Sequence, residues 1–217
     1  MILQTLTFWR RHRRLVLFAG IAVMVLAAAA RWPLELERAL FREGDRGHDL
    51  RLRHEEVAVW FSGESIAVDS SSTYPPASYL VLWPAVGWLD LTAARWAWTA
   101  TCIALLALLA WAAVRLADAR DGPERVFLTA FFFSAYAPLV TIGNGQLTMH
   151  VLAALAAAFA LARRESRADV WASSALFLVA LVKPNVAAPF FWVFLFASSS
   201  WAPGVLTAAG YVLLTWV

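Results

Sequence analysis

The chain has 217 residues, of which 61% are hydrophobic and only 15% are charged. Soluble domains contain about 45–50% apolar and about 25% charged residues, so the composition excludes a water-soluble enzyme and a disordered chain. The single Cys102 excludes an internal disulfide, and a net charge of +3 without a basic, aromatic-rich tract argues against a nucleic-acid partner. The 12 Trp and 14 Phe residues are typical of chains that cross membrane interfaces. We therefore expect an all-α polytopic membrane protein.

Apolar runs follow one another along most of the chain, and a membrane-spanning helix needs about 20 mostly apolar residues. The first run, 15–32, comes directly after a basic cluster at 10–14, so the positive-inside rule places the N-terminus in the cytoplasm. Ala27 to Ala30 also resemble a signal-peptidase site, but the chain beyond them stays membranous, which favours an uncleaved helix. The further apolar runs are 76–90, 92–116, 126–142, 147–162, 170–182, 185–198 and 203–217.

The distribution of charge predicts which segments lie on the same side of the membrane. Together with the N-terminus, the Arg-rich segments 115–125 and 163–167 hold ten of the eighteen basic residues. Segment 33–73 instead holds nine acidic residues and five Arg, a net charge of −4. Placing the three basic segments in the cytoplasm puts segment 33–73 on the outer side.

Only one net crossing then fits between the acidic outer segment and the next Arg-rich turn. Segment 92–116 is long enough for it, so 76–90, which Pro84 and Gly87 interrupt, becomes a re-entrant or interfacial segment at the outer face. All polar clusters other than the Arg-rich turns fall on this outer side: segment 33–73, Tyr74-Pro75-Pro76, Asn144-Gly145-Gln146 and Lys183-Pro184-Asn185. This one-sided pattern predicts a functional site at the outer membrane boundary.

The acidic outer segment contains a candidate general base. A helix is expected from Asp49, with Asp49 as its N-cap and with Leu52, Val59 and Trp60 facing the membrane. A carboxylate at this place can accept the proton of a hydroxyl group, whereas the competing interpretation makes Asp49 only a cap on a solvated helix. A metal site is disfavoured, because no H-x-x-x-H or E-x-x-H pair occurs among the nearby candidate ligands His48, Asp49, His54 and Glu55.

Two outer turns carry polar side chains that allow both a structural and a functional interpretation. Tyr74 precedes two prolines, which form a stiff helix entry and could also hold its side chain rigidly at a substrate cavity. Asn144 lies between two glycines that supply a hairpin turn. Gln146 is expected to begin an apolar helix, where Ser or Asp would cap better, so its amide is available to a sugar hydroxyl or a phosphate oxygen.

Lys183 is the most informative single residue. It is the only Lys among the eighteen basic residues, and it directly follows an apolar stretch. An ionisable residue at membrane depth is costly and is by default a functional candidate, although a Lys at a helix end can also extend its ammonium to water. Pro184 breaks the helix at the same point. A phosphate is the natural partner of such a compact, strongly charged donor.

These motifs, in this order and spacing, resemble the family-87 glycosyltransferases over roughly residues 10–200. The family consists of membrane enzymes with the GT-C architecture and is similar to the polyprenol-phosphate-mannose-dependent mannosyltransferases. The residues that carry the resemblance are Asp49-Leu50-Arg51-Leu52-Arg53 with Glu56, Tyr74-Pro75-Pro76, Gly145-Gln146 and Lys183-Pro184. The acidic segment lacks the close Asp-x-x-x-Tyr pattern of better-matched members, which leaves the acceptor unspecified.

The resemblance implies that a mannose-like hexose moves from a polyprenyl-phosphate donor to a hydroxyl acceptor on a glycolipid or glycan, with inversion. The reaction would take place at the outer face of a bacterial plasma membrane. Asp49 matches the catalytic base of the family, and Asp45 is a second possibility. Lys183 would hold the donor phosphate, and the remaining substrate-binding candidates are Glu56, Tyr74, Asn144, Gln146 and Asn185. The scheme requires no nucleotide, no other cofactor and no obligatory metal, although an ion bridging Asp49 and the phosphate remains an open alternative.

The resemblance also implies a single transmembrane domain over 1–217, with 33–75 as an outer catalytic loop that carries interfacial helices. Because the chain ends at Val217 within an apolar run, we expect the N-terminal part of a longer protein or a truncated reading frame. The main alternative function is a transporter or flippase for an anionic lipid-linked substrate, with 76–90 and Lys183 lining its path. A sugar-polymer ligase and a purely structural membrane subunit are further alternatives.

Overall fold

A computed structural model describes residues 2–41, 47–63, 74–164, 166–197 and 200–216, with the backbone alone for residues 2–11. Every regular element in these ranges is helical, which confirms the all-α expectation. The elements are α1 (Ile2–Leu40), α2 (His48–Ser62), α3 (Pro76–Leu82), the π-helical turn η1 (Trp83–Gly87), α4 (Leu91–Leu116), α5 (Gly122–Ser134), α6 (Tyr136–Gly143), α7 (Thr148–Ala162), α8 (Arg167–Ala180), α9 (Pro184–Ala187), the 3-10 turn η2 (Ala188–Phe190), α10 (Phe191–Ala197) and α11 (Ala202–Thr215).

Two helices and two bent helix pairs of the described chain are apolar and long enough to cross a membrane, as the sequence predicts. Residues 12–40 of α1 and the whole of α4 meet this test alone. Two bent pairs meet it jointly: α5 with α6, which are inclined by 43°, and α8 with residues 184–196, which are inclined by 118°. The break between α5 and α6 has a clear cause, because Pro138 lacks the N–H that would bond to the Ser134 carbonyl.

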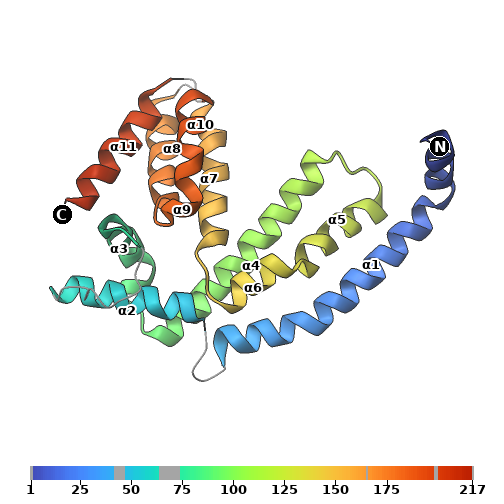
Figure 1. Ribbon diagram of the computed structural model, residues 1–217, viewed down its shortest axis with the longest axis horizontal. Coiled ribbons are helices and arrows are strands. Elements are labelled where there is room, and N and C mark those ends of the chain that lie inside the picture. The colour runs from blue at the N-terminus through green and yellow to red at the C-terminus, as the bar shows by residue number, and fades with distance from the viewer. Residues whose placement is uncertain (1, 42–46, 64–73, 165, 198–199, 217) are drawn as a thin grey trace.

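The helices form two arms that diverge from a common base (Figure 1). One arm contains α1, α4, α5 and α6, and the other contains α7, α8, α10 and α11, while α2 and α3 lie across the base. A continuous buried core runs from α2 and α3 through α4 into α7 and α8, and it includes Val57, Tyr79, Cys102 and Phe177. The base is therefore where segments far apart in the sequence meet.

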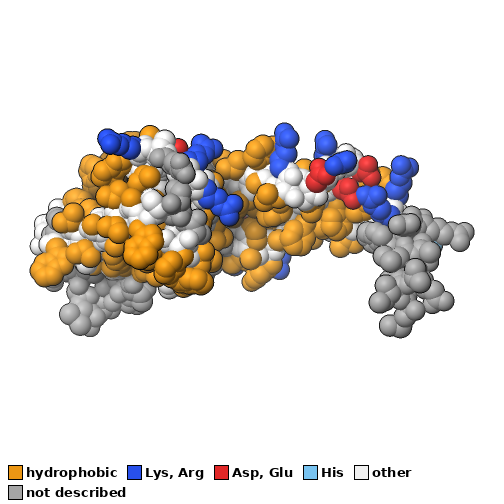
Figure 2. Space-filling view, turned by 90° about the horizontal axis from the view of Figure 1, so that it is seen from above, with side chains coloured by type: hydrophobic (Ala, Val, Ile, Leu, Met, Phe, Trp, Pro, Cys, Tyr) orange, Lys and Arg blue, Asp and Glu red, His pale blue; other side chains and the backbone are white. Residues whose placement is uncertain are grey.

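The Arg-rich segments lie at the end of the molecule opposite this base. The start of α1, the α4–α5 turn and the α7–α8 turn are all at the upper end in Figure 1, whereas α2, the α6–α7 turn and the α8–α9 bend are at the lower end. Seen from above, Lys and Arg side chains are spread over both halves of an otherwise largely apolar surface (Figure 2). Arg13 joins two of the basic segments by ion pairs with Glu124 and, at 3.3 Å, with Asp121.

The acidic outer segment differs from its prediction in two respects. α1 continues to Leu40, well past the expected end at residue 32, so the segment begins as helix. α2 begins at His48 with Gly47 in the N-cap position, and the prediction that Asp49 is the N-cap is wrong. The buried residues of α2 are Leu50, Arg53, Glu56 and Val57, whereas the expected membrane-facing residues Leu52, Val59 and Trp60 are half-buried. Asp45, the second candidate base, lies outside the described residues.

The segment expected to be re-entrant forms the short helix α3 and the π-helical turn η1 at the base. These elements have 7 and 5 residues, which is too short to cross a bilayer of about 30 Å. Pro84 and Gly87 lie within η1, where a Cβ on Gly87 would overlap the Trp83 ring. The Asp90 side chain then accepts the Ala93 N–H at 2.9 Å and begins α4.

Candidate functional site

One face of α2, which lies at the base of the molecule, carries a row of charged residues. Asp49, Arg53 and Glu56 are spaced by four and three residues, so their side chains share one side of the helix. Asp49 is half-buried, while only 7% of Arg53 and 9% of Glu56 is exposed. The guanidinium of Arg53 pairs with the Glu56 carboxylate at 2.6 Å. Separating this buried pair would leave each charge without its partner, which is costly. The pair therefore holds Arg53 and Glu56 in one geometry.

Tyr74 lies against this charged row. The Arg53 guanidinium is 4.1 Å from the centre of the Tyr74 ring, and the Tyr79 hydroxyl donates to the Tyr74 carbonyl at 3.4 Å. Burial raises the pKa of the Tyr74 phenol; the charge of Arg53 opposes this rise, and the carboxylates of Asp49 and Glu56 add to it. The phenol therefore stays protonated at neutral pH and can donate a hydrogen bond.

The turn between α6 and α7 contacts the first turn of α2. The backbone N–H of Asp49 donates to the Asn144 carbonyl at 3.1 Å, which gives an N-terminal amide of α2 its partner. Gly145 has φ +67°, and a Cβ at this position would lie 2.7 Å from the Leu50 Cβ and 3.3 Å from the Gly47 carbonyl oxygen. Only glycine permits both this backbone conformation and this close approach.

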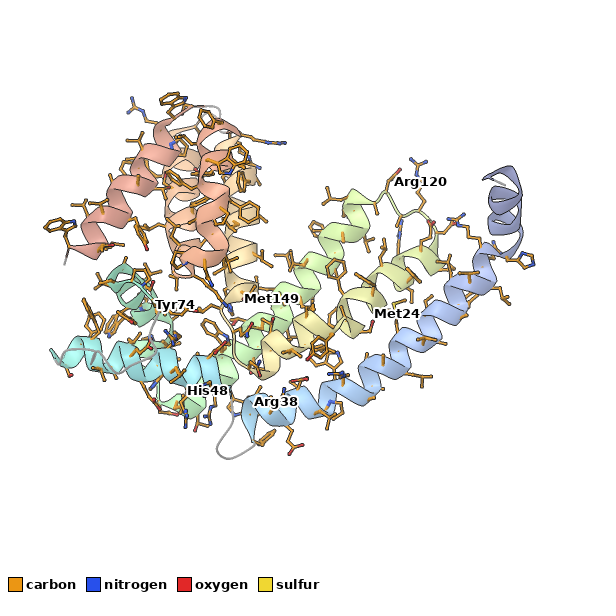
Figure 3. The ribbon with its side chains drawn as sticks, in the orientation of Figure 1. Met24, Arg38, His48, Tyr74, Arg120 and Met149 are labelled. Atoms are coloured by element: carbon orange, nitrogen blue, oxygen red, sulfur yellow. The ribbon has the colours of Figure 1, made fainter. Side chains whose placement is uncertain are left out.

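Lys183 lies at the bend between α8 and α9. Its ammonium donates to the Thr148 hydroxyl at 3.0 Å, and Thr148 is the first residue of α7. The Ser78 hydroxyl of α3 donates to the carbonyl of Val182 at 3.0 Å, so the bend is also joined to the helix that follows Tyr74. Asp49, Tyr74 and Lys183 thus belong to one connected set of contacts, and Figure 3 shows His48, Tyr74 and Met149 around the same region of the base.

The other predicted residues lie in the same region but make fewer contacts. Gln146 is half-buried and lies in the turn, two residues before α7 begins, so it does not start the helix as expected. Asn185 is exposed on α9. His48 is exposed, and a ring nitrogen of His54 lies 2.8 Å from the Leu89 carbonyl oxygen. Within the described ranges, no three His, Cys, Asp or Glu side chains come together as a metal site.

Three residues of this region were not singled out in the sequence: Glu35, Ser78 and Thr148. Arg53 was named there only as part of the motif that carries the resemblance, without a role of its own. The four-and-three spacing of Asp49, Arg53 and Glu56 could have identified Arg53. Thr148 is a hydroxyl at the start of an apolar helix, which is a weaker signal, and Ser78 is ordinary in a short helix. Glu35 gave no signal, because the sequence placed it in an outer segment, whereas it is 4% exposed in α1.

A separate hollow of about 520 Å³ lies near the basic end of the molecule, lined by Arg13, Arg14, Leu17, Phe18, Asp121, Gly122 and Pro123. The polar cluster at the base combines features that this hollow lacks: a half-buried carboxylate, a protonated phenol and an ammonium at the end of an apolar bundle. A carboxylate can take a proton, and an ammonium can bind an anionic group. The base is therefore the candidate site.

Comparison with protein families gives a match over two thirds of the chain. The model of glycosyltransferase family 87 matches residues 73–217, a range that includes Tyr74, Gln146 and Lys183 and begins after Asp49 and Glu56. A search of curated proteins and a search of solved structures each found no match. The apolar helices and the matched range together identify a membrane glycosyltransferase. The chain belongs to glycosyltransferase family 87.

Proposed function

We propose that the protein transfers a hexose, mannose-like, from a polyprenyl-phosphate donor to a hydroxyl of a glycolipid or glycan acceptor, with inversion, at the outer face of a bacterial plasma membrane. The observation that carries this proposal is that Asp49 acts electrostatically on Tyr74, while Asp49 and Lys183 are bonded to Asn144 and Thr148 at the same α6–α7 connection, at one end of an apolar bundle. A GT-C type architecture accords with an all-helical domain whose apolar helices are long enough to cross a membrane. A lipid-linked donor accords with a polar site at the end of such helices.

In the proposed reaction, Asp49 is the general base. The acceptor oxygen forms a bond to the anomeric carbon while the bond from that carbon to the phosphate oxygen breaks. The acceptor proton passes to the Asp49 carboxylate, and the electron pair of the broken bond stays on the departing polyprenyl phosphate. Attack from the face opposite the leaving group inverts the anomeric configuration.

Lys183 would stabilise the leaving group in this scheme. The phosphate gains negative charge as it departs, so an ammonium beside it binds the transition state more strongly than the ground state. Tyr74, Glu56 and Gln146 would orient the sugars, with Asn144 and Asn185 at the edge of the site. The hydrogen bond from Lys183 to Thr148 holds the ammonium at the α8–α9 bend before the donor binds.

The decisive experiment compares wild-type protein with Asp49→Asn in membrane vesicles that contain the full-length chain. Transfer is followed from radiolabelled polyprenyl-phosphate hexoses to endogenous acceptors. Because Asn keeps the size of Asp and removes the base, we expect transfer to fall by at least about a hundredfold, within the range of general-base contributions.

Glu55→Gln is the matched control, since Glu55 is a carboxylate of the same helix whose side chain is 57% exposed and pairs with Arg51. We expect it to transfer at the wild-type rate. Full activity of Asp49→Asn would reject Asp49 as the base. Wild-type membranes that transfer none of the hexoses would reject the proposed donor class and favour an anionic-lipid transporter.

A further inference from the structure

Glu35 is a buried carboxylate in a helix that is otherwise little buried. Only 6% of the residues in the apolar window of α1 are covered by the rest of the protein, yet Glu35 is 4% exposed. Its carboxylate oxygens lie 3.8 Å from a guanidinium nitrogen of Arg31 and 3.2 Å from one of Arg38. Burying a charge is costly unless it is paired, and two arginines one turn away on either side meet this requirement.

The Glu35 carboxylate lies directly against the backbone of the α6–α7 turn. A Cβ built on Gly143 would overlap the Glu35 carboxylate and would lie 3.4 Å from the Arg38 Cδ. Gly143 does not have a positive φ, so a Cβ at this position is opposed by contact with the Glu35 side chain and not by the backbone conformation. Figure 3 shows Arg38 and His48 near each other at the base, where the ends of α1 and α2 meet.

The same turn holds the first turn of α2. Asn144, the residue after Gly143, accepts the N–H of Asp49 at 3.1 Å, and Gly145 packs against Leu50. A short path of direct contacts therefore runs from Glu35 through Gly143 and Asn144 to Asp49. Glu35 is at one end of this path, and Asp49, the proposed general base, is at the other end.

We propose that Glu35, clamped between Arg31 and Arg38, is a positioning residue that fixes the 143–145 turn and thereby the place of Asp49 in the site. This inference rests on the proposed role of Asp49 as the base. Placement of a base strongly affects the chemical step, since a misplacement of about 1 Å can cost about a hundredfold in rate. A residue that acts in this way changes kcat while leaving substrate affinity largely intact.

A double-mutant cycle at the contact between Glu35 and Gly143 tests the proposal. Gly143→Ala should displace the carboxylate and lower kcat by about tenfold or more, with KM within about twofold of wild type. Glu35→Ala should lower kcat similarly, because the turn loses its support. In the double variant, the truncated side chain makes room for the new methyl group, so Gly143→Ala should cost much less than it does alone.

Hydrogen exchange of the α2 peptide that contains Asp49 provides a readout that does not depend on activity. We expect faster exchange of the Asp49 amide in Glu35→Ala and in Gly143→Ala, and a smaller increase in Glu35→Gln, which keeps the size of the side chain and one acceptor oxygen but loses its charge. Glu37→Ala, on the same helix, is the control and should leave exchange unchanged.

The outcomes separate this inference from the proposed function. Faster exchange in both variants, together with wild-type membranes that transfer no sugar, would retain the positioning contact and reject the proposed chemistry. Unchanged exchange and additive losses of kcat would reject the positioning role while leaving Asp49 as the base. A rise in KM with unchanged kcat would also reject it, since Glu35 would then affect substrate binding.

Discussion

Lys183 and Thr148 approach each other from the ends of two apolar helices, and their 3.0 Å hydrogen bond joins the α8–α9 bend to the start of α7, which follows the turn that contacts α2. If the ammonium holds the donor phosphate, Lys183→Ala removes a charged hydrogen bond worth about 1.5–3 kcal/mol. We expect kcat/KM for sugar transfer to fall by about 10-fold to 150-fold. Lys183→Arg should restore part of the activity, because it keeps the charge and changes its geometry.

The control for Lys183 is Arg120→Ala, which removes an exposed cation at the opposite end of the molecule, where it pairs with Asp118 at 2.7 Å. This variant should transfer sugar at the wild-type rate. Equal losses in the two variants would show that net charge, and not the phosphate contact, accounts for the effect of Lys183.

Tyr74 gives a prediction about pH. Its pKa is raised in the folded protein, mainly by burial, so the protonated phenol is favoured there relative to the unfolded chain. The resulting contribution to stability is complete below the ordinary tyrosine pKa of about 10 and is lost as the pH rises through the folded pKa. Tyr74→Phe should therefore lose less stability than wild type on going to alkaline pH.

The tyrosinate absorbance of wild type minus that of Tyr74→Phe isolates the titration of this residue. We expect a midpoint above that of a model tyrosine peptide. A midpoint at or below the model value would mean that Arg53 outweighs burial, in which case the phenol could not be relied upon as a donor in alkaline conditions.

At the scale of residues, the sequence identified a site residue whose type is rare in its surroundings, but not one whose type is common there. Lys183 stood out because it is a lone Lys after an apolar stretch, and the structure places it at a helix break next to a hydroxyl. Glu35 did not stand out, since acidic residues are common in outer segments. Its burial depends on Gly143, more than a hundred residues away, and no local pattern reports such a contact.

At the scale of elements, substitutions at two glycines allow the stability cost of backbone strain to be compared with the added cost of a close contact. Gly63 and Gly145 both have positive φ, at +78° and +67°, but a Cβ on Gly63 would meet no atom of the described residues within 4 Å, whereas one on Gly145 would press against Leu50. Gly63→Ala should cost only the left-handed backbone term of about 1–2 kcal/mol. Gly145→Ala should cost more in stability and should also lower sugar transfer, because it pushes the first turn of α2 away.

Thermal unfolding in detergent and the transfer assay measure the two effects in parallel. Equal destabilisation of the two variants would mean that the α6–α7 turn does not pack tightly on α2. Gly122→Ala is the neutral control, since its φ is not positive and nothing lies within 4 Å of the added atom.

The helices themselves were partly predictable. The run 92–116 coincides closely with α4, because the long, mostly apolar stretch between Arg95 and Arg115 leaves little freedom. The start of α2 was placed wrongly at Asp49, since the capping pattern assumes that a side chain at the N-cap accepts from the first amides of the helix. Here a carbonyl from Asn144 supplies that partner, and the helix begins at His48 without a side-chain cap.

At the scale of the whole molecule, charge asymmetry predicted which turns share an end, and the three Arg-rich segments do lie at the end of the molecule opposite the base, at the tips of the two arms (Figure 1). The divergence of the two arms was not predictable. The 43° and 118° bends inside the two arms were not predictable either, because a proline such as Pro184 marks a helix break but not the angle at which the chain continues, and the run 126–142, which contains Pro138, was expected to be one segment.

The orientation of the molecule in the membrane gives the last prediction. If the basic end faces the cytoplasm, a membrane-impermeant thiol reagent added to intact cells should label His48→Cys and Asn185→Cys, because both residues are exposed at the base. The same reagent should reach Arg120→Cys and Arg164→Cys, whose native side chains are 82% and 67% exposed, only after the membrane is opened. Unmodified protein should remain unlabelled, since Cys102 is completely buried.

Labelling at the four positions tests the orientation of the protein in the membrane separately from its fold. Reversed labelling, with the Arg positions reactive in intact cells, would overturn the positive-inside assignment and place the site on the cytoplasmic face, where a different set of sugar donors is present. Labelling that divides either pair would contradict the fold, because the two members of each pair lie at the same end of the molecule. Since lipid-linked sugars and their acceptors are asymmetric across a bilayer, the side on which His48 reacts decides which donors the transfer assay must supply.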